Sequence, residues 1–95
     1  MSATTVSAAK FQLGQIVATP NALNQLTQDD ILTGISRHQA SDWGDMVSDD
    51  RNENDQALAK GCRLLSVYHA KNGVKFWIIT EADRNSTTVL LPEDY

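Results

Sequence analysis

The sequence predicts an α+β fold: an N-terminal strand, two to three helices, and a C-terminal three-stranded antiparallel meander with the helices packed on one face. Asn72-Gly73 lies between two runs rich in β-branched and aromatic residues, 63–70 and 74–81. This pattern is a strong hairpin signal because both turn residues tolerate positive φ. A third such run, 86–91, follows after a short polar break and completes the meander.

The first element is a strand predicted over residues 11–19, with Gly14 at a bulge or a close backbone approach. We expect this strand to join the meander at an edge or beside the last strand. Residues 1–10 are expected to be a disordered tail, and residues 11–95 a single α+β domain.

Two helices are predicted next from their capping residues. Thr19 can cap a short helix over 20–26, and Pro20 suits its first position, where the missing N–H costs nothing. Thr27 can cap a second helix whose first turn is acidic, as the helix dipole favours. The expected apolar stripe of this second helix consists of Ile31, Leu32 and Ile35.

A third helix is predicted over about residues 49–60 after a loop anchored by Trp43. Ser48 and the acids behind it open this helix, and Gly61 is the expected C-cap. Ala57 and Leu58 should point inward. Most of the helix is polar, so we expect it to lie on the surface.

A two-residue turn at Asn72-Gly73 would pair Val67 with Ile78 and Tyr68 with Trp77. Val67, Phe76 and Ile78 then form the core face, and Tyr68, Trp77 and Ile79 form an exposed aromatic patch. The alternative role of Tyr68 and Trp77 is a cross-strand aromatic pair that stabilises the hairpin by ~0.5–1 kcal/mol without any partner.

The composition is that of an ordered, water-soluble chain, with 41% hydrophobic and 21% charged residues. No apolar run approaches the ~20 residues of a membrane span. The N-terminus lacks the basic start and apolar stretch of a signal peptide, and the single Cys62 fits a reducing compartment. We therefore expect a cytoplasmic protein that does not bind membranes.

Negative charge is concentrated in the middle of the chain. Residues 29–55 carry eight acidic side chains against Arg37 and Arg51, whereas the flanking segments are nearly balanced. Proteins that bind nucleic acid directly carry the opposite sign on their contact face. Direct nucleic-acid binding is therefore not expected, and the acidic segment is a candidate surface for a protein partner.

Several separated blocks also match a known family in order. They are 11–20, Asp42-Trp-Gly-Asp45, 77–84 and 87–92, followed by Tyr95. Over residues 11–95 the chain resembles small uncharacterised bacterial proteins from plasmids and other mobile elements, labelled plasmid-related or type I restriction subunit M. The methyltransferase glycine-rich loop and Asn/Asp-Pro-Pro-aromatic motif are absent, so the resemblance implies a genetic setting and no reaction.

A metal site is the main alternative that the residues allow. The side chains of metal-ligand type in this region are His38, Asp42, Asp45, Asp49 and Asp50. A hard divalent cation is held by several oxygen ligands, such as aspartate carboxylates, that lie in one place. No EF-hand spacing, His-Glu-x-x-His motif or cysteine pair accompanies them, and the aspartates also suit loop and cap positions.

The sequence therefore favours a small non-enzymatic protein-interaction module, with no catalytic, cofactor or metal residue assigned. The candidate interaction surface consists of Asp42, Asp45, Asp49, Asp50, Glu53, Asp55, Tyr68 and Trp77. The alternative is a metal-binding protein or small enzyme that uses His38 and the neighbouring acids. A homodimer, formed through the exposed sheet face or an open edge strand, is a third hypothesis.

Overall fold

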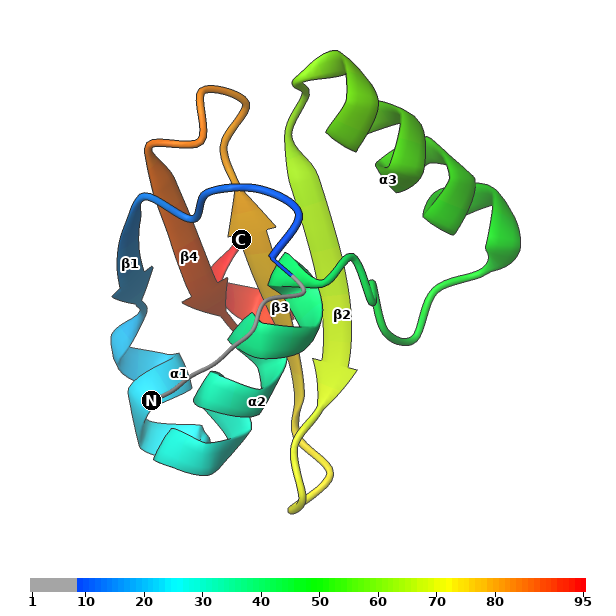
Figure 1. Ribbon diagram of the computed structural model, residues 1–95. Coiled ribbons are helices and arrows are strands. Elements are labelled where there is room, and N and C mark those ends of the chain that lie inside the picture. The colour runs from blue at the N-terminus through cyan, green and yellow to red at the C-terminus, as the bar shows by residue number, and fades with distance from the viewer. Residues whose placement is uncertain (1–8) are drawn as a thin grey trace, which may run out of the picture.

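The computed structural model describes residues 9–95, which form a four-stranded mixed sheet with helices (Figure 1). Its elements are β1 (Gln15–Ala18), α1 (Pro20–Gln25), α2 (Gln28–Gln39), α3 (Ser48–Lys60), β2 (Leu64–His69), β3 (Lys75–Thr80), β4 (Ser86–Leu90) and the 3₁₀ turn η1 (Pro92–Asp94). The α+β class is confirmed. The expected N-terminal tail lies, up to residue 8, outside the described residues.

The strand order is β1-β4-β3-β2, so the N-terminal strand joins the meander beside its last strand, as expected, and makes a four-stranded mixed sheet. β2, β3 and β4 are antiparallel neighbours as expected, and β1 joins beside β4 in parallel. Gly14 adopts φ 65°, and an added Cβ would overlap the backbone of Asn85. The predicted close approach at Gly14 is therefore present, directly before the strand.

The hairpin contains a three-residue loop, which corrects the predicted pairing by one residue. Ala70 N–H donates to Val74 O at 2.8 Å, and Gly73 N–H donates to Ala70 O at 2.9 Å. Gly73 has φ 88°, as in a turn closed by a glycine bulge. The Asn72 side chain accepts from Val74 N–H, which favours this loop over the two-residue turn.

This correction exchanges the faces of β2 relative to β3. Tyr68 pairs with Phe76 and Val67 pairs with Trp77. A shift of one residue sends every side chain of a strand to the other face. Tyr68 therefore lies in the core, only 2% exposed, whereas Val67 lies on the opposite face. The predicted Tyr68/Trp77 patch is wrong for this reason.

α1 and α2 cover one face of the sheet, here called the inner face (Figure 1). Thr19 and Thr27 cap them through their side-chain oxygens, as predicted, and Thr27 with Asp30 forms a capping box. The predicted stripe of α2 needs one correction, because Leu32 is 53% exposed. Gly34 lies against the sheet instead, where its missing side chain leaves room for Phe76.

A chain of hydrogen bonds runs through the inner face. The ring nitrogens of buried His38 lie 2.5 Å from Ser66 Oγ and 2.8 Å from Thr80 Oγ1. Thr80 also contacts the Thr87 hydroxyl, which donates to the carbonyl of Leu13. The chain thus links β2, β3 and β4 to the segment that enters β1.

The direction of this chain follows from its last member. A carbonyl oxygen only accepts, so the Thr87 proton is used on Leu13 and Thr87 must accept from Thr80. Thr80 then accepts from His38 Nε2–H. Burial lowers the pKa of His38 to about 4, with a smaller contribution from the charge of Arg84, so the imidazole is neutral near pH 7. Its Nδ1 therefore carries no proton and accepts from the Ser66 hydroxyl.

α3 lies beside β2 and not on the inner face (Figure 1). The prediction that the helices pack on one face of the sheet is therefore correct only for α1 and α2. Gly61 forms the expected left-handed C-cap, but no side chain caps the N-terminus at Val47. Asn54 is the buried residue of α3, whereas the predicted Ala57 and Leu58 are half-buried.

Asn54 and a loop close the outer edge of β2. The Asn54 side chain donates to Leu65 O and accepts from Leu65 N–H at 3.3 Å, as a neighbouring strand would. Val67 N–H donates to Trp43 O, and Asp45 N–H donates to Val67 O at 2.8 Å. Gly44 is required between them, because it has φ 82° and an added Cβ would overlap Val67 O.

Candidate interaction groove on the outer face of the sheet

The face of the sheet opposite α1 and α2, here the outer face, is partly open. β2 and β3 place Leu65, Val67, Trp77 and Ile79 on it by strand alternation. Tyr95 follows η1 and packs edge-on against Trp77, with ring centroids 5.6 Å apart. Tyr95 covers only part of the outer face, and hollows remain on either side of Leu65.

Two hollows adjoin on this face because they share Arg63 and Leu65. The first, of about 400 Å³, lies between α3 and β2 and is lined by Met46, Asp50, Glu53, Asn54, Ala57, Arg63 and Leu65. The second, of about 300 Å³, is lined by Arg63, Leu64, Leu65, Trp77, Ile79 and Tyr95. Together they form what we call the Arg63 groove, with one acidic wall and one aromatic wall.

Of the charged side chains that line the groove, Arg63 has partners within the chain, whereas the two acids do not form ion pairs with any of residues 9–95. Arg63 Nε lies 3.4 Å from Glu81 Oε1, and its guanidinium donates to the Tyr95 hydroxyl at 2.8 Å. Asp50 and Glu53 are exposed and form no ion pair with any of residues 9–95. The acidic wall is therefore the part of the groove whose charge is available to a partner.

The structure brings three of the sequence-predicted site residues to this groove. Asp50 and Glu53 line its acidic wall, and Trp77 lines its aromatic wall. Asp49 lies on the same helix and is exposed but does not line the groove. The acidic segment and the aromatic side chain, predicted as separate surfaces, thus meet.

The other predicted acids make local contacts. Asp42 Oδ2 accepts from Arg37 Nε at 2.7 Å, and this hydrogen bond lowers the pKa of Asp42. Asp45 lies 3.7 Å from His69, and Asp55 accepts from the Trp43 indole N–H at 2.9 Å. Asp42 and Asp45 thus make contacts within and beside the loop, as expected for loop aspartates. Asp55, in the middle of α3, ties the helix to Trp43.

Tyr68 is removed from any surface role that needs its ring exposed. It packs against Phe76 in the core, and its hydroxyl donates to the backbone carbonyl of Asp42 at 2.6 Å. Burial raises its pKa. The Tyr68 side chain therefore anchors the loop that precedes α3.

The side chains considered for a metal do not converge. His38 is buried and bonded to two hydroxyls, and Asp42 turns toward Arg37. Within residues 9–95, no group of three or more His, Cys, Asp or Glu side chains is placed to hold an ion. His38 would have to break its contacts with Ser66 and Thr80 to become a ligand.

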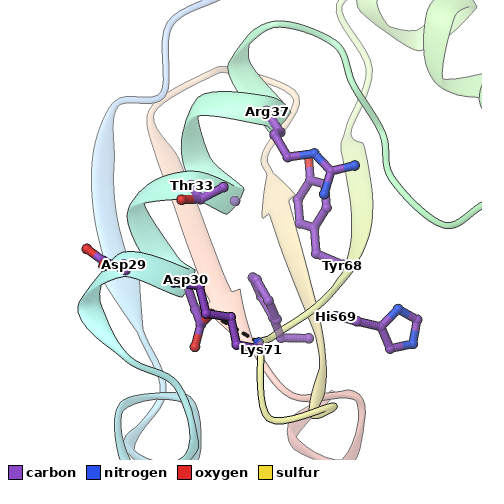
Figure 2. A pocket seen from close by; sticks show the side chains of 9 residues that line it. Asp29, Asp30, Thr33, Arg37, Tyr68, His69 and Lys71 are labelled. Atoms are coloured by element: carbon purple, nitrogen blue, oxygen red, sulfur yellow. Dashed lines mark hydrogen bonds between the residues drawn. The ribbon is translucent and has the colours of Figure 1, made fainter.

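A smaller hollow of about 170 Å³ lies between α2 and the end of β2 (Figure 2). Arg37 lies over the Tyr68 ring at 4.7 Å, and the side chain of Asp30 accepts from the backbone N–H of Lys71. Small-molecule sites are typically roughly 300–1,000 Å³, and both Arg37 and Asp30 already have partners within the chain. This hollow is the weaker candidate.

Sequence reasoning missed Arg63, Leu65, Tyr95 and Asn54 as parts of the site. Asn54 carried a signal, because it precedes Ala57 and Leu58 by three and four residues and so shares their helix face. A polar residue on the buried stripe of a helix indicates a specific hydrogen-bond partner. Arg63 and Tyr95 are far apart in the sequence and carried no such signal.

Comparisons of the chain with protein-family models, with curated proteins and with solved structures give no match. Across the described residues, no helix is both long enough and apolar enough to cross a membrane.

Proposed function

We propose that this chain is a small non-enzymatic, cytoplasmic protein-interaction module, which binds a basic segment of another protein in the Arg63 groove. The observation that carries the proposal is the position of Asp50 and Glu53 in a hollow that adjoins the aromatic one, with no ion pair to any of residues 9–95. The resemblance to proteins of plasmids and other mobile elements supports a role in such an element.

The two walls would contribute differently to binding. Leu65, Trp77 and Tyr95 offer apolar and aromatic surface, which is typical of the residues that dominate binding energy. Asp50 and Glu53 would accelerate encounter with a basic partner and select against acidic ones. The segment that fits has an apolar or aromatic side chain next to Lys or Arg.

Affinity capture from host cells, followed by kinetic measurement with the captured partner, tests the proposal. Replacing Asp50 and Glu53 by Asn and Gln should slow association and weaken its salt dependence, because charges at the rim act mainly on encounter. The matched control removes one Asp and one Glu outside the groove, Asp49→Asn with Glu93→Gln. Equal effects of both double variants would refute the groove as the binding site.

The aromatic wall is tested separately. Trp77→Leu keeps an apolar residue in the sheet but removes the ring, and we expect affinity to fall at least about tenfold. Circular dichroism must first show that the variant is folded. Unchanged affinity in a folded Trp77→Leu variant would remove the aromatic wall from the proposal.

The second candidate function, metal binding through His38 and nearby acids, gains no specific support from these positions. Calorimetric titration with Mn²⁺ or Zn²⁺ still decides it directly. Saturable micromolar binding that is lost in His38→Ala would favour it over the interaction module.

A further inference from the structure

Among residues 9–95, β1 is an edge strand with no strand neighbour on its outer side, and its outward backbone groups can be identified. Gln15 N–H donates to Asn85 O and Thr19 N–H donates to Val89 O, so the odd-numbered residues of β1 face β4. By alternation, the N–H and C=O groups of Ile16 and Ala18 point away from the sheet. Within residues 9–95 no strand lies on that side.

An apolar hollow of about 530 Å³ lies on the inner face beside this edge. It runs from Ile16 to the exposed sides of α1 and α2, where Leu23 is 61% and Leu32 is 53% exposed. Three of the six exposed large hydrophobic residues among residues 9–95 line this hollow, namely Ile16, Leu23 and Leu32. A fourth, Val17, lies on the same strand edge but faces the outer side of the sheet. A patch of this kind beside an open strand edge marks an association surface.

The charge distribution indicates what associates there. Residues 11–28, which contain β1 and α1, carry no charged side chain, whereas the chain as a whole has a net charge of −4. Two copies repel each other wherever their acidic segments meet. The uncharged β1 flank, remote from α3 at the opposite edge of the sheet, is where two copies can meet without that repulsion. Residues 15–18 also contain no lysine or proline, two residue types that commonly prevent pairing at an edge strand.

We propose that β1 pairs antiparallel with β1 of a second copy of this chain, around a two-fold axis at Val17. Ile16 of each copy then exchanges both backbone hydrogen bonds with Ala18 of the other, and the two Val17 residues face each other. The result is a continuous eight-stranded sheet in which the two apolar hollows adjoin on the inner face. The two Arg63 grooves lie at the far edges and remain accessible.

Light scattering after size-exclusion chromatography tests this pairing with matched variants. The wild-type chain should have twice the 10.5 kDa mass of one copy. Val17→Lys places two like charges opposite each other and should raise the dissociation constant at least about 100-fold. Val47→Lys is the control, because Val47 is a more exposed valine beside α3, and it should remain dimeric.

Leu32→Glu provides a second variant that leaves the sheet untouched and should also weaken the dimer. Hydrogen exchange should show protected amides at Ile16 and Ala18 in the wild-type dimer and fast exchange in Val17→Lys. The proposal is overturned by a wild-type chain that stays monomeric at about 1 mM, where even weak self-association is populated. It is equally overturned if both variants remain dimeric, or if a strand of a different protein is what pairs with β1.

Discussion

The two edges of the sheet are treated in opposite ways. At the β2 edge, the Asn54 side chain and the backbone of Trp43 and Asp45 occupy the groups of Leu65 and Val67. At the β1 edge, no strand among residues 9–95 pairs with the outward backbone groups of Ile16 and Ala18, which lie beside exposed apolar side chains. Residues at the first edge should therefore determine the stability of one chain, and residues at the second should affect association while leaving that stability nearly unchanged.

The largest expected effect is that of Gly44→Ala at the closed edge. The added methyl group would overlap Val67 O, and the residue would remain at φ 82°. We expect the free energy of unfolding to fall by at least about 3 kcal/mol, measured by urea denaturation. Gly61→Ala is the control, with φ 75° but open space around it, and should cost about 1 kcal/mol. Equal losses would mean that closure of the edge contributes little.

The second prediction concerns the His38 hydrogen-bond chain, which joins the closed edge to the entry of β1. The pKa of His38 is about 4 in the folded chain, below its ordinary 6.5. As the pH falls, His38 therefore becomes protonated in the unfolded chain at a higher pH than in the folded chain. Stability that is complete above pH 6.5 should decline toward pH 4 by about 3 kcal/mol.

Urea denaturation at a series of pH values measures this decline. His38→Asn should be less stable at neutral pH, but its stability should vary less between pH 6.5 and 4. The carboxylates whose pKa values are lowered, among them Asp30 and Asp94, act below this window, because their ordinary value is 3.8. A wild-type chain with the same pH dependence as His38→Asn would contradict the neutral, buried imidazole.

Asn54→Ala gives the third effect, again at the closed edge. The substitution leaves both Leu65 backbone groups without their partner, which should cost about 2 kcal/mol. Asn52→Ala, on the exposed side of the same helix, should change stability by less than about 0.5 kcal/mol. Hydrogen exchange at Leu65 N–H should accelerate only in Asn54→Ala. If both variants behave alike, Asn54 does not close the edge.

The smallest effect belongs to the open edge. Leu32 is 53% exposed, so Leu32→Gln should change the unfolding free energy of a dilute, monomeric chain by less than about 0.5 kcal/mol. Thermal denaturation at low concentration measures this. A loss above 1 kcal/mol would show that Leu32 belongs to the core of the single chain, and the contrast between the edges would fail.

Much of the fold could be predicted because its signals are local. Thr19 and Thr27 cap helices with their own side chains, and Gly61 ends α3 in a conformation that glycine favours. The hairpin was predicted in place but not in register, because Asn72 uses its side chain on Val74 and so selects the longer loop. That single residue decides whether Tyr68 is core or surface.

The groove could be predicted only in part, because its members meet through long-range contacts. The acids of α3 and Trp77 were identified as candidates from charge and aromatic character. Their approach depends on Asn54, which binds the edge of β2 and sets α3 beside it. In the sequence, Asn54 shares the helix face of Ala57 and Leu58, which marks it as a buried polar residue. Its partner, however, is a backbone group that no side-chain pattern encodes.

The parallel pairing of β1 with β4 has a consequence for synthesis of the chain. β1 leaves the ribosome before β4, its only strand neighbour among the described residues, which is completed at Leu90. At roughly 5–20 residues per second, the intervening segment takes several seconds to appear. During that time the uncharged segment 11–28 has no β4 to pair with. Chaperone demand and cotranslational aggregation should therefore depend on this segment, and placing β1 after β4 by circular permutation should reduce both.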